Sequence, residues 1–136
     1  MGSRLNPYLN FRGQAREALE FYSSVFGGDV VVSTFGEFGD PPPGSAASDV
    51  MHGQLETAMG FTLMCSDVPA QMDLTAGDNV SVSLSGDDVD ALHGYWERLS
   101  VDGTVTFPLE RQVWGDEFGQ LKDRFGVSWL VNIAAG

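Results

Sequence analysis

Residues 79–100, NVSVSLSGDDVDALHGYWERLS, contain the pattern that decides the fold. Val80, Val82 and Leu84 alternate with polar residues, which is typical of a strand with one buried face and one polar face. The two aspartates that follow can cap a helix. Apolar residues then recur at helical spacing, namely Val89, Leu92, Trp96 and Leu99. This stretch therefore predicts a strand over 79–85 followed directly by a helix.

A second copy of this pattern lies near the start of the chain. An apolar-rich run over 5–11 precedes a helix, which is predicted by apolar residues at 15, 18, 19, 22, 25 and 26. The segment ALEFY at 18–22 matches ALHGY at 91–95, an offset of 73 residues from 18 to 91. Because the order of elements is repeated as well, duplication is the better interpretation. The same offset aligns Tyr8 with Ser81 and Asn10 with Ser83.

The remaining strands are predicted by short alternating or β-branched runs, over 29–34, 50–56, 61–66, 104–113, 118–122 and 127–133. Pro108 indicates an edge strand or a bulge. Glycine at 126 suits a hairpin turn over 123–126. Residues 35–48 are rich in Gly, Pro and Ser and predict a loop. We expect one domain over 1–136, with two modules at 5–67 and 78–134.

Composition and charge exclude several classes of protein. Hydrophobic residues make up 43% of 136 residues, which is enough for a packed core and excludes wholesale disorder. The net charge of −12 repels phosphate backbones and anionic lipid, so we expect no nucleic-acid partner and no membrane partner. The single Cys65 cannot form an intrachain disulfide. The start of the chain lacks the apolar stretch of a signal peptide, and we expect a cytoplasmic protein.

Several segments together resemble the PhnB-like proteins. These segments are PYLNF at 7–11, EALEFY at 17–22, FGG at 26–28, WGDEFG at 114–119 and DRFGVSW at 123–129. PhnB-like proteins are members of the glyoxalase/bleomycin resistance group, the vicinal oxygen chelate superfamily. The resemblance implies an α+β fold of two βαβββ modules, whose sheets curl into a cup with the helices packed outside. It also implies that the cup holds a small molecule and that the protein is a homodimer.

The name 3-demethylubiquinone methyltransferase-like, which some of these proteins carry, finds no support in the sequence. A methyl-donor site would show a glycine-rich loop between a strand and a helix, with an acidic residue downstream. Enzymes of the superfamily instead usually hold a divalent metal with His, Glu or Gln. In those enzymes the metal ligands come from the first strand of each module and from the last strand. The resemblance places these ligand positions at Tyr8, at Asn79 or Ser81, and near Leu130 in this chain. Tyr, Asn and Leu do not form such a site at neutral pH, so we expect no metal and no other cofactor.

His52 is the residue to which we assign a catalytic role. It shares one strand face with Gln54 and Glu56, because residues two apart on a strand project to the same side. Imidazole is the side chain best suited to proton transfer near neutral pH. The alternative is a hydrogen-bonded polar residue that lines a cavity. His93 lies off the apolar stripe of its helix, and we expect it to be solvated.

The ligand-binding set lies on the strand faces expected to line the cup. Met64 projects opposite Cys65, which we expect to be buried. Trp114 and Phe118 flank a turn near the expected rim, where they could stack on a ligand or close the core or a dimer interface. The full set is Tyr8, Asn10, Gln54, Glu56, Met64, Ser81, Ser83, Trp114, Phe118 and Asn132.

Three functions are compatible with these observations. The first is a metal-free cup that binds a small molecule, with an unassigned reaction. The second is a metal-dependent isomerase, dioxygenase or thiol transferase that uses an atypical ligand set such as His52 and Glu56. The third is a dimeric binding protein without catalysis. Nucleotide chemistry is excluded, because the sequence has neither a P-loop nor a G-x-G-x-x-G motif.

Overall fold

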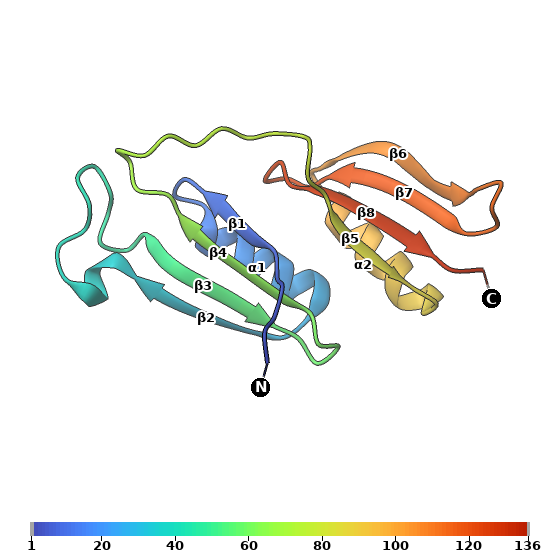
Figure 1. Cartoon of the computed structure of the whole chain (residues 1–136), viewed down its shortest axis with the longest axis horizontal. Helices are drawn as coiled ribbons and strands as arrows, with labels where there is room; N and C mark the ends of the chain where they lie inside the picture. The colour runs from blue at the N-terminus through green and yellow to red at the C-terminus, as the bar shows by residue number, and fades with distance from the viewer. Residues whose placement is uncertain (1, 136) are drawn as a thin grey trace. The chain divides into compact units, whose positions relative to one another are not determined.

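The computed structural model describes residues 2–135 and divides into two compact units, Met1–Thr75 and Ala76–Gly136 (Figure 1). Each unit contains a four-stranded sheet with one α-helix between its first and second strands. The first unit has the strand order β1-β4-β3-β2, in which only β1 and β4 run parallel. Its elements are β1 (Tyr8–Phe11), α1 (Ala15–Phe26), β2 (Asp29–Thr34), the 3₁₀-helix η1 (Phe35–Phe38), β3 (Val50–Glu56) and β4 (Thr62–Asp67).

Helix α1 covers one face of the first sheet. Its buried side chains are those that the helical spacing predicts, namely Ala15, Ala18, Leu19, Tyr22, Val25 and Phe26. Gly27 follows with a φ of 76°, a conformation that glycine adopts without strain. A Cβ atom added to Gly53 would overlap Leu19 Cδ1. Gly53 therefore faces the helix, and its neighbours along β3 face away from it.

A buried carboxylate holds the start of this helix in place. Asp67 Oδ1 accepts a hydrogen bond from the backbone N–H of Ala15, and Oδ2 accepts one from the N–H of Val50, both at 2.9 Å. The residue before the helix, Gln14, makes no side-chain cap. Asp67 therefore satisfies an N–H group at the helix terminus that would otherwise lack a partner, and it links α1, β3 and β4.

The second unit repeats the topology of the first. Its strand order is β5-β8-β7-β6, and only β5 and β8 run parallel. Asp88 accepts a hydrogen bond from the N–H of Ala91 and caps α2. As predicted from Pro108, β6 is an edge strand with register shifts around Phe107. The elements are β5 (Val82–Gly86), α2 (Val89–Ser100), β6 (Thr104–Arg111), β7 (Glu117–Lys122) and β8 (Ser128–Ile133).

The two units also bury side chains at equivalent positions. Phe11 and Leu84, Leu19 and Leu92, and Tyr22 and Tyr95 are buried pairs that lie 73 residues apart. The α+β class with two βαβββ modules is therefore confirmed. No helix within residues 2–135 is long and apolar enough to cross a bilayer.

Three details differ from the sequence predictions. The strand predicted from residue 79 begins at Val82, and Val80 is 74% exposed because it lies in the connector before the sheet. In α2, Val89 is 43% exposed, whereas Tyr95 is buried. Leu92 and Leu99 are buried as predicted, whereas Trp96 is only half-buried and Tyr95 is the third buried side chain of this helix. The segment predicted as a loop over 35–48 begins with the 3₁₀-helix η1.

Candidate functional site

The face of the first sheet that points away from α1 contains most of the predicted site residues. Met64 on β4 is the register partner of Tyr8 on β1 and of Gln54 on β3. Paired residues of neighbouring strands share a face, so these three side chains lie side by side. The face is accessible, because Tyr8 is 44% exposed and Val31, the β2 partner of Gln54, is 68% exposed.

Four of these side chains form a continuous chain of hydrogen bonds, which we call the polar row: Tyr8, His52, Gln54 and Glu56. The Tyr8 hydroxyl lies 3.3 Å from His52 Nδ1, and the two rings are 5.7 Å apart between centroids. His52 Nε2 lies 3.5 Å from Gln54 Oε1. Gln54 Nε2 donates to Glu56 Oε1 at 2.9 Å. The structure therefore brings these predicted residues together.

The polar row has a direction. Because the Gln54 amide nitrogen donates to Glu56, the amide oxygen is the group that faces His52. An amide oxygen only accepts, so the proton of neutral imidazole belongs on Nε2. Nδ1 is then an acceptor, which the Tyr8 hydroxyl satisfies. Glu56 thus acts on His52 through Gln54, and the lone pair at Nδ1 is the one that the Tyr8 hydroxyl contacts.

Arg4 extends the polar row and was missed by the sequence analysis. Arg4 Nη1 lies 3.3 Å from Glu56 Oε1, and Arg4 Nη2 donates to the hydroxyl of Thr62, which is buried. Arg4 precedes β1 and belongs to neither a strand nor a helix. No periodicity in the sequence marks it, which is why only the structure reveals this contact. Asn10 is exposed on β1, with Ser66 as its register partner, and is not a member of the polar row.

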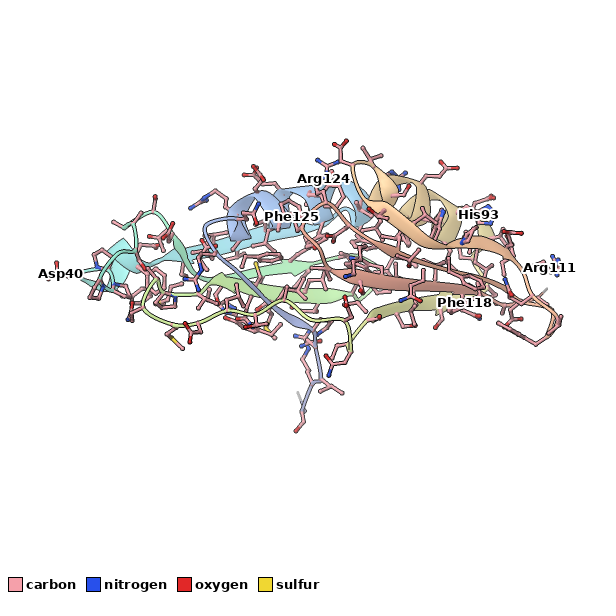
Figure 2. The ribbon with its side chains drawn as sticks, turned by 90° about the horizontal axis from the view of Figure 1, so that it is seen from above. Asp40, His93, Arg111, Phe118, Arg124 and Phe125 are labelled. Atoms are coloured by element: carbon pink, nitrogen blue, oxygen red, sulfur yellow. The ribbon has the colours of Figure 1, made fainter. Side chains whose placement is uncertain are left out.

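The predicted residues of the second unit do not form a comparable row. Phe118 contacts Trp114, with 6.2 Å between ring centroids, and Trp114 is 59% exposed. Ser83 is exposed with Leu130 as its register partner, and Ser81 lies before β5. Phe118 and His93 lie on opposite sides of this sheet (Figure 2).

Asn132 serves a local structural role. Its Nδ2 donates to Asp116 Oδ2 at 3.0 Å, and the N–H of Ala135 donates to Asp116 Oδ1 at 2.9 Å. These hydrogen bonds, the one from Asn132 first, lower the pKa of Asp116, with a smaller contribution from the charge of Arg111. The amide of Asn132 therefore holds the turn before β7, which leaves less of its hydrogen-bonding capacity for a ligand.

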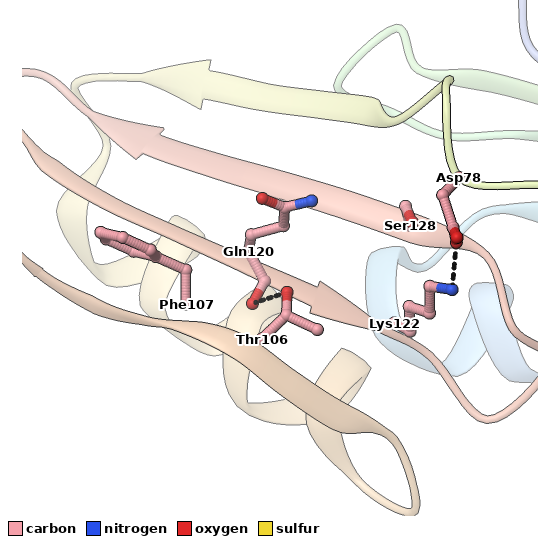
Figure 3. Close-up of a pocket in the computed structure, with 6 residues that line it drawn as sticks. All are labelled: Asp78, Thr106, Phe107, Gln120, Lys122 and Ser128. Atoms are coloured by element: carbon pink, nitrogen blue, oxygen red, sulfur yellow. Dashed lines mark hydrogen bonds and ion pairs between the residues drawn. The ribbon is translucent and has the colours of Figure 1, made fainter.

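The second unit has an open pocket of about 340 Å³ that the sequence analysis did not predict (Figure 3). The ammonium group of Lys122 pairs there with the carboxylate of Asp78, and Thr106 Oγ1 donates to the backbone oxygen of Gln120 at 3.1 Å. One signal was available, because Lys122 is the single lysine of the chain. The lining residues are Asp78, Thr106, Phe107, Gln120, Lys122 and Ser128.

The side chains at the expected metal positions do not fit a divalent transition metal. Tyr8 lies on the first strand, and Leu130 lies on the last. Both ring nitrogens of His52 have hydrogen-bond partners. Across residues 2–135, no three His, Cys, Asp or Glu side chains are close enough to hold an ion. The donor set therefore does not match the one that the superfamily's enzymes use.

His93 and Cys65 lie outside the polar row. The side chain of His93 is 44% exposed, which agrees with the expected solvation, and its Nε2 lies 3.1 Å from Glu117 Oε1, a contact that the sequence did not predict. The expectation that Cys65 is buried was correct, since its exposed fraction is 1%. Burial, together with the charge of Asp67, raises the pKa of Cys65 to about 12. Cys65 is therefore a thiol, not a thiolate nucleophile, at neutral pH.

Comparisons with known proteins identify the family. The family model described as 3-demethylubiquinone-9 3-methyltransferase matches residues 3–132. Protein YjdN of Escherichia coli is 23% identical, over 95% of this chain and 94% of its own length. Protein Rv0887c of Mycobacterium tuberculosis, which is uncharacterized, is 33% identical, over 93% of this chain and 72% of its own length.

Solved structures agree with this match. Protein PA1353 from Pseudomonas aeruginosa has a TM-score of 0.84 at 30% identity, covering 99% of this chain and 100% of that one. The PhnB protein of Bacillus cereus has a TM-score of 0.79 at 26% identity, covering 97% and 100%. A glyoxalase/bleomycin resistance protein/dioxygenase family enzyme from Burkholderia phytofirmans shares the fold, with a TM-score of 0.61 at 16% identity, covering 93% and 95%. This chain therefore belongs to the PhnB-like family, which carries the 3-demethylubiquinone-9 3-methyltransferase description, and it has the glyoxalase/bleomycin resistance fold.

Proposed function

We propose that this protein binds a small polar molecule on the face of the first sheet away from α1, with His52 at the centre and without the usual divalent metal. The observation that carries the proposal is the polar row, whose hydrogen bonds run from Tyr8 to Glu56. An ordered row fixes where a ligand's polar groups must lie.

His52 is the residue best placed to act on such a ligand. Gln54 holds the proton on Nε2, so Nδ1 can accept a hydrogen bond or a proton once the Tyr8 hydroxyl turns toward the ligand. Met64 and the Tyr8 ring supply apolar contact area beside this nitrogen. We leave the reaction unassigned, because the same geometry serves binding and proton transfer alike.

We do not extend the methyltransferase activity named in the family description to this chain. The connector between β1 and α1 is Arg12-Gly13-Gln14, which has one glycine and not the glycine-rich loop of a methyl-donor site. The alternative of a metal-dependent enzyme that uses His52 and Glu56 has less support, because both residues are hydrogen-bonded to Gln54.

The chain's two histidines allow a direct test. Protein labelled with carbon-13 histidine gives one imidazole signal from His52 and one from His93, which belongs to the second unit, pairs with Glu117 and serves as an internal reference. We would add a library of small polar compounds and expect some to shift the His52 signal in a saturable way while the His93 signal stays unchanged. The shift should be lost in Tyr8→Phe, which removes the hydroxyl but keeps the ring.

A matched pair of variants completes the test. His52→Ala should abolish binding of any compound found in this way, whereas His93→Ala should leave it intact. If no compound perturbs His52, or if His52→Ala binds the same compounds with the same affinity, the proposal is wrong. Specific binding without turnover would instead support the binding function and count against catalysis.

A further inference from the structure

The pocket of the second unit combines a cation, an aromatic wall and polar side chains. The cation is Lys122, in a chain with a net charge of −12. The aromatic wall is Phe107, which is 44% exposed and contacts Phe118 edge to face at 5.7 Å between centroids. In Figure 3 the side chain of Gln120 lies between Phe107 and Lys122. The three groups line one pocket from two neighbouring strands, β6 and β7.

The internal partner of Lys122 is held weakly. The side chain of Asp78 is 78% exposed and that of Lys122 is 41% exposed, so water screens their ion pair. Exposed pairs of this kind contribute little to stability. Asp78 precedes β5 and belongs to neither a strand nor a helix. An anion in the pocket can therefore replace this carboxylate on Lys122 at small cost.

Two further side chains of the pocket have unused hydrogen-bonding capacity. Within residues 2–135, the amide of Gln120 and the hydroxyl of Ser128 make no hydrogen bond to another residue. Thr106, in contrast, already donates to the backbone oxygen of Gln120. An amide and a hydroxyl can both donate and accept. They can therefore recognise a polar substituent between the ring and the anionic group of a ligand.

We propose that this pocket binds a small molecule that consists of a planar ring with an anionic group, a carboxylate or a phosphate. The anion replaces Asp78 on Lys122, the ring packs against Phe107, and Gln120 contacts a polar substituent. A volume of about 340 Å³ accommodates one substituted ring. The inference rests on the proposed small-molecule function, but it concerns another unit and other residues.

The single lysine makes the test specific. Protein labelled with carbon-13 lysine reports on Lys122 alone. The probes are benzoate, phenyl phosphate and benzamide, which has the shape of benzoate without its charge. We expect benzoate or phenyl phosphate to shift the Lys122 signal saturably, and the stronger of the two identifies the anion. Benzamide should bind about tenfold more weakly or not at all.

Three variants test the roles of the charges. Lys122→Met should weaken binding of the anionic probe about tenfold. Asp78→Asn should strengthen it about two- to fivefold, because it removes the competing carboxylate. Arg124→Gln removes one positive charge from the turn between β7 and β8, outside the pocket, and should leave binding unchanged. If the ion pair between Lys122 and Asp78 were only structural, Asp78→Asn would not bind the anionic probe more tightly than the wild type.

The inference is wrong if neither anionic probe binds the wild type or Asp78→Asn, if benzamide binds as tightly as benzoate, or if Lys122→Met binds as well as the wild type. The His52 signal, recorded in the same samples, separates the two proposals. Compounds that shift His52 while no probe shifts Lys122 would refute only the inference. Probes that shift Lys122 while nothing shifts His52 would refute only the role of His52.

Discussion

The imidazole of His52 has a different partner on each nitrogen, and Gln54 determines which nitrogen carries the proton. Gln54→Leu removes the acceptor of the Nε2 proton and breaks the link to Glu56. We expect this variant to lose the preference for the Nε2 tautomer, with a loss of stability of about 1 kcal/mol. Nitrogen-15 spectra of the imidazole measure the tautomer directly.

Gln112→Leu is the matched control, because that amide donates to the backbone oxygen of Glu110 in the second unit. It should leave the His52 spectrum unchanged. If Gln54→Leu retains the wild-type tautomer of His52, the polar row does not orient the ring.

Cys65 provides a second test at the scale of one residue. Its pKa is raised to about 12 by burial and by the charge of Asp67, so the folded protein keeps it protonated well above its ordinary pKa. Thiolate is the reactive form. At about pH 8 we expect iodoacetamide to label Cys65 about a hundredfold more slowly in the folded protein than in urea. Equal rates would show that the thiol is accessible.

At the scale of secondary-structure elements, the side chain of Asp67 connects α1 and β3, since its two oxygens accept hydrogen bonds from the first backbone N–H group of each. Asp67→Asn replaces one of these acceptors with an N–H₂ group and leaves a buried N–H without its partner. We expect a loss of about 1–3 kcal/mol in the free energy of unfolding, measured in urea. The control, Asp73→Asn, changes an exposed carboxylate and should have little effect. Equal stabilities of the two variants would contradict this role of Asp67.

Most elements could be predicted because their signals are local. Helix α1 and strand β2 match the predicted spans, because helical spacing before Gly27 and a β-branched run are both clear patterns. Pro108 correctly indicated an irregular edge strand. The start of β5 was predicted too early. The alternation of apolar and polar residues extends back to Val80, whereas pairing with β8 begins only at Val82. Periodicity reports a tendency, and pairing decides where a strand begins.

The candidate site could be predicted only where it lies on strands. His52, Gln54 and Glu56 were placed on one face by their spacing, and the structure joins them by hydrogen bonds. Arg4 was missed because it reaches Glu56 from a segment outside any regular element. Lys122 was missed because its significance depends on Asp78, which is 44 residues away along the chain. Contacts of this kind follow from tertiary structure, which no local pattern encodes.

At the scale of the whole molecule, the family resemblance predicts a homodimer, and exposed apolar side chains offer surface for one. Val31 in the first unit is 68% exposed, and Val113 in the second is fully exposed. Burying such side chains between two copies would favour association. Light scattering after size exclusion should therefore give twice the chain mass of 14.6 kDa. A mass of 14.6 kDa at all concentrations would contradict the dimer.

The central claim is that the protein uses its side chains, and not a resident divalent metal, to hold a small molecule. In the most direct test, the protein is incubated with Ni²⁺, Mn²⁺, Zn²⁺ or Fe²⁺ and desalted, and its metal content is then measured by mass spectrometry. Because the expected positions hold Tyr8 and Leu130 and because His52 is engaged at both nitrogens, we predict far less than one ion retained per chain. Near-stoichiometric retention that is lost in His52→Ala but kept in His93→Ala would contradict the account and favour a metal-dependent enzyme.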